Sequence, residues 1–314
     1  MSAVRRQRGM ALITALVLVA MATILATAIA FRSTLTARRG IAIFTMTQSM
    51  RFGEAAEAMA AYVLNQAVQQ TSITTPNQDW AQPYGPIQMD ENTTLEAQLE
   101  DEQGKFNINH LLGAQGVVNP VALAEFQRLL TELQIDPGIA SQVADWIDAD
   151  SVPTQPDGAE DNTYLAMTPA YRAPNVPISS ISELLALPGM NRAIYDRLSP
   201  YITALPVSAL LNVCTASGVV LDAMLNHIEY SNDPDQLQAL RTQANGCFPA
   251  TSLLSTTANP QLWAELQPNL TDNSQYFRLR TWIALGTTQF TLYSLIQRSS
   301  GGNIHIILRT FGTE

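Results

Sequence analysis

Basic residues are scarce in this sequence. Its 314 residues include 17 Lys and Arg against 27 Asp and Glu, which gives a formal net charge of −10. Because a phosphate backbone is bound through clustered Lys and Arg, nucleic acid is not an expected partner. The acidic balance suits divalent cations or basic protein surfaces instead.

Groups that could carry out catalysis are also few. The three histidines, His110, His227 and His305, show no metal-ligand spacing. Serine and threonine are abundant, but none lies in a nucleophile elbow or beside a placed base. The sequence therefore favours a protein that is not an enzyme.

Ionisable residues are absent from the apolar run at 10–31. A run of roughly 20 apolar residues matches the thickness of a bilayer core, whereas the apolar part of a cleaved signal peptide has only about 7 to 15. The run therefore predicts a transmembrane helix. Arg5, Arg6 and Arg8 precede it. Because basic flanks stay in the cytoplasm, the rest of the chain is expected outside.

Proline is missing between Met10 and Pro76, and the good helix formers Ala, Leu, Met, Gln and Glu dominate this stretch. Apolar residues at helical spacing continue beyond residue 31. The pattern predicts a single helix of about 60 residues, ~90 Å long. The simpler alternative is a membrane helix followed by a separate amphipathic helix, with the break at Gly40 or Gly53.

The junction between leader and apolar run is abrupt: the leader ends at Gly9 and the run starts at once with Met10. This junction resembles the cleavage signal of type IV pilins and pseudopilins, in which a prepilin peptidase cuts after the glycine and methylates the new N-terminus. The resemblance implies a cleaved leader at 1–9, a transmembrane part at 10–31 and an extracytoplasmic helical stalk at 32–75. A plain, uncleaved signal anchor is the alternative.

The fifth residue of that expected mature chain is Thr14. Most pilins and pseudopilins carry a glutamate there, and its charge is thought to pair with the N-terminal amine of a neighbouring subunit inside the bilayer. Loss of this glutamate is a feature of the K-type minor pseudopilin of type II secretion systems, a subunit with no neighbour ahead of it. Alternatively, Thr14 is simply a small residue tolerated in a membrane helix.

The exported part predicts a sheet interrupted by helices. Alternation of apolar and polar residues predicts strands near 93–98 and 104–108, and three more strands are expected within 274–314. Because consecutive strands normally pair through short loops, the mainly helical residues between them predict an inserted domain. The expected fold class is α+β, a pilin-like long N-terminal helix packed on a small antiparallel sheet. The sheet is expected from 76–110 and 274–314, and the large, mostly helical insertion from 111–273.

The insertion contains a possible repeat. Residues 180–203 and 251–271 both end in Leu-x-Pro-x-Ile/Leu-Thr, and the phrases FNINHL at Phe106 and LNVCTA at Leu211 precede them. Duplication of a strand-plus-helices module accounts for this, and chance similarity between helical hairpins is the alternative. The segment LLALPGM at 184–190 resembles a helix-hairpin-helix turn. In these acidic surroundings we expect it to pack rather than to bind DNA.

The whole layout resembles the K-type minor pseudopilin, in which a large helical domain interrupts the pseudopilin sheet. The resemblance runs through DEQGKFNIN, DWIDAD, DGAEDNTY, NVPISSISELLALPGM and LNVCTA to the terminal strands. It implies a tip subunit of the type II secretion pseudopilus that initiates or caps assembly, so that folded proteins are exported across the outer membrane. A type IV pilus minor pilin or a membrane-anchored, calcium-dependent adhesin are the alternatives.

The same resemblance implies partners and a location. The expected partners are other minor pseudopilins in a tip complex, the major pseudopilin, the prepilin peptidase and, as further candidates, the exported substrates. The expected location is the inner membrane, crossed once, with the C-terminal bulk in the periplasm.

Carboxylates crowd residues 145–161, and no Lys or Arg lies between Arg128 and Arg172. Prolines and a glycine in this segment predict a loop. Clustered carboxylates repel one another unless a cation bridges them, and calcium takes about six to eight oxygen ligands at flexible angles. We expect calcium, which the resembling family binds, and the alternative is a merely solvated loop. The expected ligands come from Asp148, Asp150, Asp157, Glu160 and Asp161.

Cysteine occurs only twice, as Cys214 and Cys247. In an exported domain an even count suggests a disulfide, here one that closes a loop of about 30 residues. Two free buried thiols are the alternative.

Overall fold

The computed structural model describes residues 7–113, 116–226, 230, 232–243, 246–247, 264, 266–299 and 302–312. The first six residues of the expected leader lie outside this range. The chain divides into two units, Met1–Glu54 and Ala55–Glu314. The fold that carries the candidate sites belongs to the second unit.

Helix α1 (Gln7–Gln70) is a single helix of 64 residues. The alternative with a break at Gly40 or Gly53 is wrong, because a glycine within a helix costs only about 1 kcal/mol and no proline interrupts the hydrogen bonding. Its N-terminal part has a mean hydropathy of 2.5 over an 18-residue window and could cross a membrane by length and composition.

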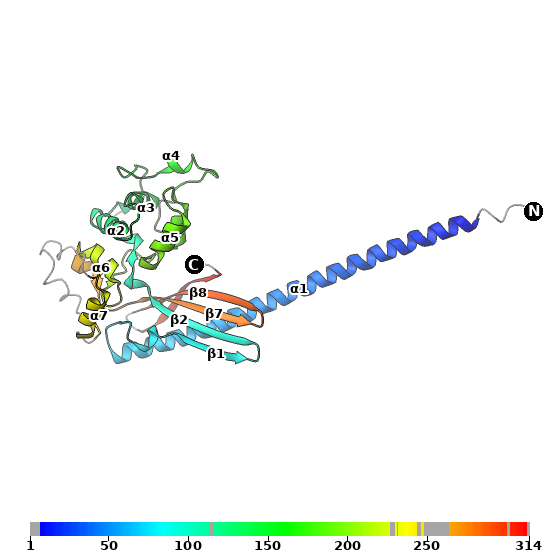
Figure 1. Cartoon of the computed structure of the whole chain (residues 1–314), viewed down its shortest axis with the longest axis horizontal. Helices are drawn as coiled ribbons and strands as arrows, with labels where there is room; N and C mark the ends of the chain where they lie inside the picture. The colour runs from blue at the N-terminus through cyan, green and yellow to red at the C-terminus, as the bar shows by residue number, and fades with distance from the viewer. Residues whose placement is uncertain are drawn as a thin grey trace, which may run out of the picture. The chain divides into compact units, whose positions relative to one another are not determined.

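Five strands form one antiparallel sheet in the order β1-β2-β7-β8-β9 (Figure 1). Strands β2 and β7 pair from Thr93 with Leu285 to Asp101 with Phe277. The chain therefore enters the inserted body and returns from it at the same end of this pair, the end at Asp101 and Phe277. The strands are β1 (Tyr84–Asp90), β2 (Thr93–Asp101), β7 (Tyr276–Leu285), β8 (Thr288–Arg298) and β9 (Ile304–Phe311).

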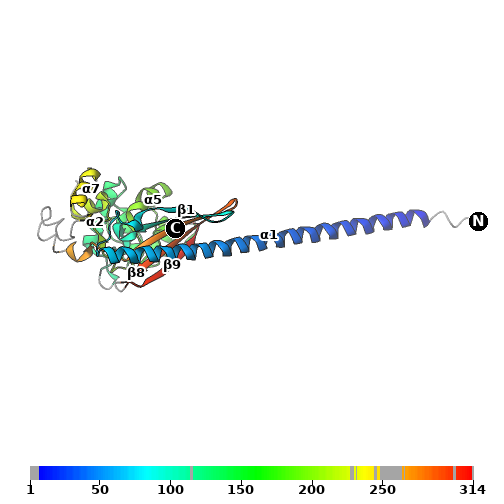
Figure 2. The same cartoon turned by 90° about the horizontal axis from the view of Figure 1, so that it is seen from below.

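The inner face of the sheet packs on the C-terminal part of α1, which runs beside β8 and β9 in Figure 2. Small residues such as Ala56 and Ala60 are buried on the helix, and Leu95, Ala97 and Leu99 alternate toward it from β2. This period of two is what one covered face of a strand requires.

An ion pair holds α1 on the sheet within the second unit. Glu57 is buried, and its carboxylate accepts hydrogen bonds from Nε and Nη2 of Arg309 on β9 at 2.7 and 2.6 Å and from the hydroxyl of Ser294 on β8 at 2.7 Å. Because a buried carboxylate is costly unless it is paired, these bonds fix the register of the helix against the sheet.

The N-terminal part of the sheet differs from the sequence-based expectation. β1 was not among the expected strands. Its Pro86 is tolerated because β1 is an edge strand. The sheet ends at Asp101 rather than at residue 110. The predicted strand at 104–108 is reduced to β3 (Phe106–Asn107), which pairs in parallel with β4 (Ile202–Thr203) in a separate two-stranded sheet.

The inserted body is mainly helical and gathers at one end of the sheet (Figure 1). One core joins its helices, with Phe126, Leu130, Val143 and Leu184 buried in it. Helix α2 shows why these segments are helical: Asn119 caps it by accepting hydrogen bonds from two backbone amides, and a proline opens the first turn. The helices are α2 (Pro120–Glu132), α3 (Ile139–Ile147), α4 (Asp161–Tyr164), α5 (Arg192–Leu198), α6 (Gly218–Leu225) and α7 (Pro234–Gln243), with the 3-10 turn η5 (Ile181–Ala186).

The two copies of the possible repeat end in matching structures. β3 pairs with β4, and β5 (Leu211–Asn212) pairs with β6 (Leu270–Thr271), both in parallel. Asn107 and Asn212 hold equivalent places: each side chain accepts a hydrogen bond from the amide two residues ahead and donates to a distant carbonyl. These matching pieces support duplication of one module, although residues 251–263 of the second copy lie outside the described residues.

Cys214 and Cys247 form a disulfide with Cα atoms 5.0 Å apart. The disulfide prediction is confirmed. Arg241 of α7 adds a hydrogen bond of 2.8 Å from Nη2 to the carbonyl of Val213, so the residues that directly follow β5 are tied both to α7 and to Cys247 beyond it.

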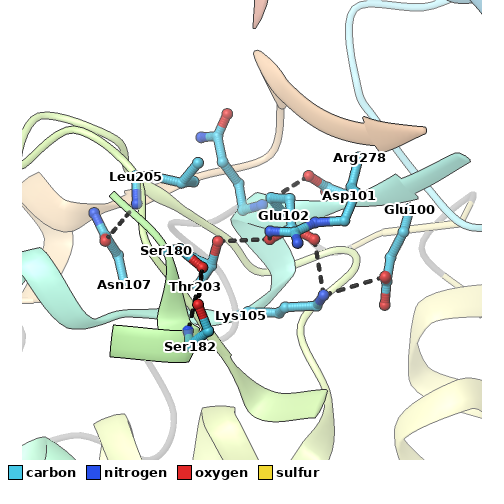
Figure 3. A network of polar contacts seen from close by, with 11 residues as sticks. Glu100, Asp101, Glu102, Lys105, Asn107, Ser180, Ser182, Thr203, Leu205 and Arg278 are labelled. Atoms are coloured by element: carbon cyan, nitrogen blue, oxygen red, sulfur yellow. Dashed lines mark hydrogen bonds and ion pairs between the residues drawn. The ribbon is translucent and has the colours of Figure 1, made fainter. Parts of the chain in front are cut away.

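Glu102 connects the sheet to the inserted body (Figure 3). Its carboxylate is fully buried and accepts hydrogen bonds from Lys105 at 2.8 Å, Thr203 of β4 at 2.6 Å and Arg278 of β7 at 3.0 Å. Burial alone would raise its pKa, but the charges of Lys105 and Arg278 lower the pKa to about 2. One carboxylate thus joins the end of β2, the body and the next strand of the sheet.

The residues on either side of Glu102 extend this connection. Gln103 donates to the carbonyl of Leu210 at 2.7 Å and accepts from the amide of Tyr276 at 3.1 Å. Asp101 accepts from the side chains of Asn212 at 3.1 Å and Ser274 at 2.6 Å. We call Asp101, Glu102 and Gln103 the joint, because each bonds to segments more than 60 residues away that belong to the body or to β7.

Replacing Glu102 with alanine should destabilise the protein by about 3 to 5 kcal/mol, because Lys105 and Arg278 would keep buried charges without their shared carboxylate. The matched control is Glu100→Ala: Glu100 also contacts Lys105, at 3.2 Å, but is half exposed, so its loss should cost less than about 1 kcal/mol. Chemical denaturation of the full chain in detergent micelles measures both values.

The pH dependence gives a second readout. Because the pKa of Glu102 is lower in the folded state than its usual value, its stabilising effect is present above its usual pKa and is lost as the pH falls toward about 2. The wild type should therefore lose more stability over this acid range than Glu102→Gln. Equal losses in the two proteins would contradict the assigned role of Glu102.

Candidate functional site

The acidic segment begins where α3 ends and returns to start α4. Asp148 follows the last residue of α3, and Glu160 immediately precedes α4. Between them the loop folds back on α3, because both carboxylate oxygens of Asp145 accept hydrogen bonds from the amide of Thr154 at 3.0 and 3.1 Å. Asp145 therefore shapes the loop.

Gly158 allows the loop to return so closely. A Cβ atom at this position would lie 2.2 Å from Oδ2 of Asp145 and 2.4 Å from the backbone nitrogen of Thr154, both far inside van der Waals contact. Its amide donates to the Thr154 carbonyl at 2.7 Å. Only glycine fits here, so the glycine of the DGAED phrase sets the path that brings Glu160 back to α3.

Three of the five expected ligands converge. Asp148, Asp150 and Glu160 each place a carboxylate oxygen within 4.8 Å of the other two. Asp148 and Glu160 are both only 2% exposed. Burial and the neighbouring carboxylates raise the pKa of Asp148 to about 6 and that of Glu160 to about 7. We call these three residues the carboxylate triad.

The two buried members of the triad, Asp148 and Glu160, have carboxylate oxygens without a hydrogen-bond donor within the residues that the structure covers. Among the residues that the structure describes, Oδ1 of Asp148 and both carboxylate oxygens of Glu160 are buried and accept no hydrogen bond. Buried carboxylates without donors are costly unless they take up protons or bind a cation. An all-oxygen donor set with flexible spacing suits a hard divalent cation such as calcium.

Asn175, which was not among the expected ligands, contacts the backbone of one triad residue. Its side-chain amide donates to the backbone carbonyl of Asp150 at 2.7 Å, and its own Oδ1 is buried with no hydrogen-bond partner in the described part of the chain. Asn175 has a φ of 50°, a left-handed conformation that asparagine tolerates. Asn175 lies 25 residues from Asp150 in the sequence, so the acidic segment gave no sign of this contact. In the sequence it stood out only as the first residue of the phrase NVPISS, part of the family resemblance.

The two remaining expected ligands lie elsewhere. Asp161 pairs with Arg172 at 2.8 Å and accepts a hydrogen bond from the amide of Ala173 at 3.2 Å. Asp157 lies against Gly138, where an added Cβ would be 2.9 Å from its Oδ2. Neither belongs to the carboxylate triad.

Aromatic rings support the site from the side of the core. Trp146 of α3 makes an edge contact with Tyr164 of α4 at 5.1 Å between centroids, and Tyr164 packs on Tyr171 at 5.5 Å. These contacts hold the end of α3 and the start of α4 together, so the positions of Asp148 and Glu160 depend on apolar packing as well as on the loop.

The expected processing site lies within α1. The helix includes both Gly9 and Met10, and the hydroxyl of Thr14 donates to the carbonyls of Met10 at 3.1 Å and Ala11 at 3.0 Å. Its polar group is therefore satisfied inside its own helix, as is common for threonine in apolar helices.

Comparison with known proteins assigns the chain to a family. A family model described as type II secretion system (T2SS), protein K, matches residues 104–207. Type II secretion system protein K of Pseudomonas aeruginosa is 33% identical, and the match covers 98% of this chain and 94% of that protein. The chain belongs to the type II secretion system protein K family. The protein K of Klebsiella pneumoniae is 30% identical over 98% of this chain and 97% of its own length.

A solved member of the protein K family shares the fold. A chain from the crystal structure of the GspK-GspI-GspJ complex of enterotoxigenic Escherichia coli superposes with a TM-score of 0.72 and 26% identity, covering 88% of this chain and 100% of that chain. The expected α+β fold, with a long N-terminal helix and an antiparallel sheet, is confirmed. Protein K is a pseudopilin, a structural component of the type II secretion system.

Proposed function

We propose that this protein is the minor pseudopilin at the tip of the type II secretion pseudopilus, where it initiates or caps assembly and so enables the export of folded proteins across the outer membrane. Its N-terminal helix is the single inner-membrane span, and the second unit lies in the periplasm. Family membership and the apolar helix support this proposal.

Thr14 is the observation that carries the tip assignment. A carboxylate at this place would need a partner within the bilayer, and a neighbouring N-terminal amine would supply it. Thr14 instead bonds to carbonyls of its own helix, so it needs no partner ahead of it. A subunit of this kind fits the first position of an assembly, with other subunits joining below it.

The partners follow from this position. The structural relative was solved in a complex with GspI and GspJ, which supports the corresponding minor pseudopilins as partners of this chain. The major pseudopilin would join below this complex, and exported substrates would meet it at the tip. A prepilin peptidase would cut after Gly9 and methylate Met10.

Thr14→Glu should impair secretion and pseudopilus assembly severalfold in a strain that lacks the native protein, because the new carboxylate would demand an amine that the tip position does not offer. Thr14→Val, which has the same size and no charge, should behave like the wild type. Secretion assays and counts of assembled pseudopili measure the effect.

The intact mass of each variant controls this experiment, since all of them should begin at methylated Met10. If Thr14→Glu is processed normally and supports wild-type assembly and secretion, the tip assignment is wrong.

The carboxylate triad is the proposed calcium site of this tip subunit. Asp148, Asp150 and Glu160 would hold the ion, and Asn175 offers a further oxygen. A bound divalent charge would offset the repulsion among the carboxylates and hold the end of α3 to the start of α4. The site would thereby stabilise the loop in the body of the protein.

Calcium should raise the melting temperature of the full chain in detergent micelles, and a chelator should reverse the change. At a calcium concentration 100 times the Kd, the stabilisation should be about 2.7 kcal/mol. Asp148→Asn and Glu160→Gln should lose this response. Asp157→Asn and Asp161→Asn are the controls and should keep it, because neither carboxylate belongs to the triad. No calcium response in the wild type, or an unchanged response in Glu160→Gln, would contradict the proposed site.

A further inference from the structure

Two exposed valines adjoin the carboxylate triad. Val152 is 72% exposed and Val176 is 53% exposed. Both belong to segments that bond to Asp150, the exposed member of the triad. The amide of Val152 donates to Oδ1 of Asp150 at 2.7 Å, and Asn175, the residue before Val176, donates to the backbone carbonyl of Asp150 at 2.7 Å. We call Val152 and Val176 the valine pair.

A proline follows each member of the valine pair. Pro153 comes after Val152 and Pro177 after Val176. The proline ring restricts the residue before it to extended backbone, so each valine has little conformational freedom left to lose when a partner covers it. A single exposed valine is ordinary on a protein surface. Two that are stiffened in this way and bonded through the same aspartate form a preorganised apolar contact.

The segment that carries the valine pair is strongly acidic. Residues 129–191 contain nine Asp and Glu and one basic residue, Arg172, which gives a formal charge of −8 in a chain of net charge −10. Arg172 pairs with Asp161, and the next basic residue, Arg192, pairs with Asp196 of its own helix. A divalent ion at the triad would leave the segment acidic. Charge complementarity therefore favours a partner that carries Lys or Arg beside an apolar side chain.

This segment lies at the end of the body remote from the sheet. Helix α4, which starts directly after Glu160 of the triad, stands across the body from β1 and the rest of the sheet in Figure 1. In the proposed assembly other subunits are expected along α1, which packs on the sheet. The remote end of the body is then left open to an exported protein.

We propose that the valine pair is a docking surface for folded exported proteins, which contact it through an apolar side chain flanked by basic residues. This inference rests on the proposed function, which supplies the class of partner and the calcium site. The partner's apolar side chain covers Val152 and Val176, and its Lys or Arg face the surrounding carboxylates. A cation at the triad would fix Asp150 and, through it, both valines, so docking should depend on calcium.

The test measures binding of the full chain, in detergent micelles with calcium, to a folded exported protein of the same secretion system purified from the culture medium. The double variant Val152→Asp/Val176→Asp should weaken the binding at least about 10-fold, because charges replace the apolar contact. A chelator should weaken wild-type binding, and Glu160→Gln should bind weakly with or without calcium. Raising the ionic strength should also weaken wild-type binding, since salt screens exposed charges.

The matched control is the double variant Met89→Asp/Ile307→Asp. Met89 of β1 and Ile307 of β9 are 41% and 49% exposed, so the same two charges are placed on apolar surface positions of the sheet. This variant should keep its affinity within about twofold of the wild type. Both double variants should keep the rise in melting temperature with calcium, which shows that they are folded and that the triad is intact.

The outcomes separate this inference from the proposed function. Binding that is lost in Val152→Asp/Val176→Asp and kept in the control supports the docking surface. Equal binding by Val152→Asp/Val176→Asp and the wild type, or no binding by the wild type, overturns it and leaves the tip assignment to the Thr14→Glu experiment. Wild-type binding that a chelator does not change overturns the dependence on calcium. A wild type whose melting temperature does not respond to calcium contradicts the proposed calcium site instead.

Discussion

The burial of one carboxylate, that of Glu102, constrains how the sheet and the inserted body of the second unit fit together. A buried charge must be paired, and the partners of Glu102 come from three places: its own turn, β4 of the inserted body and β7 of the sheet. The body can therefore sit on the sheet in few ways. Asp101 and Gln103 add bonds to Asn212 of β5, to Ser274 just before β7 and to Tyr276 of β7, so the exit of the chain from β2 and its return to β7 are held by one polar network.

Much of the fold could be predicted because it depends on local periodicity. The length of α1 follows from an unbroken run of helix formers, and the three C-terminal strands follow from alternation on a sheet with one covered face. The misses have local causes as well: Pro86 concealed an edge strand, and the two-residue strand β3 is too short to show a period. The joint could not be predicted from the sequence, because nothing local distinguishes a carboxylate that will be buried from one that stays on the surface. The partners that stabilise it, such as Arg278, lie far along the chain.

The candidate metal site shows the same limit. The density of carboxylates predicted a loop and an oxygen-rich site, but the choice of ligands depends on the fold. Arg172 pairs with Asp161, the Asp145 carboxylate holds the loop, and Gly158 directs Glu160 back toward Asp148. Asn175 reaches the site from a later segment. Which carboxylates converge is thus decided by tertiary contacts that local sequence does not contain.

The bonds of the joint should make the sheet and the inserted body one cooperative unit. Hydrogen–deuterium exchange of the full chain in detergent micelles tests this most directly, because it reports the opening free energy of each segment. If the joint couples the two parts, the slowest amides of β2, β7, β4 and α2 share one opening free energy. If the body instead exchanges much faster than a protected sheet, its fold opens independently and the joint does not have the role assigned to it.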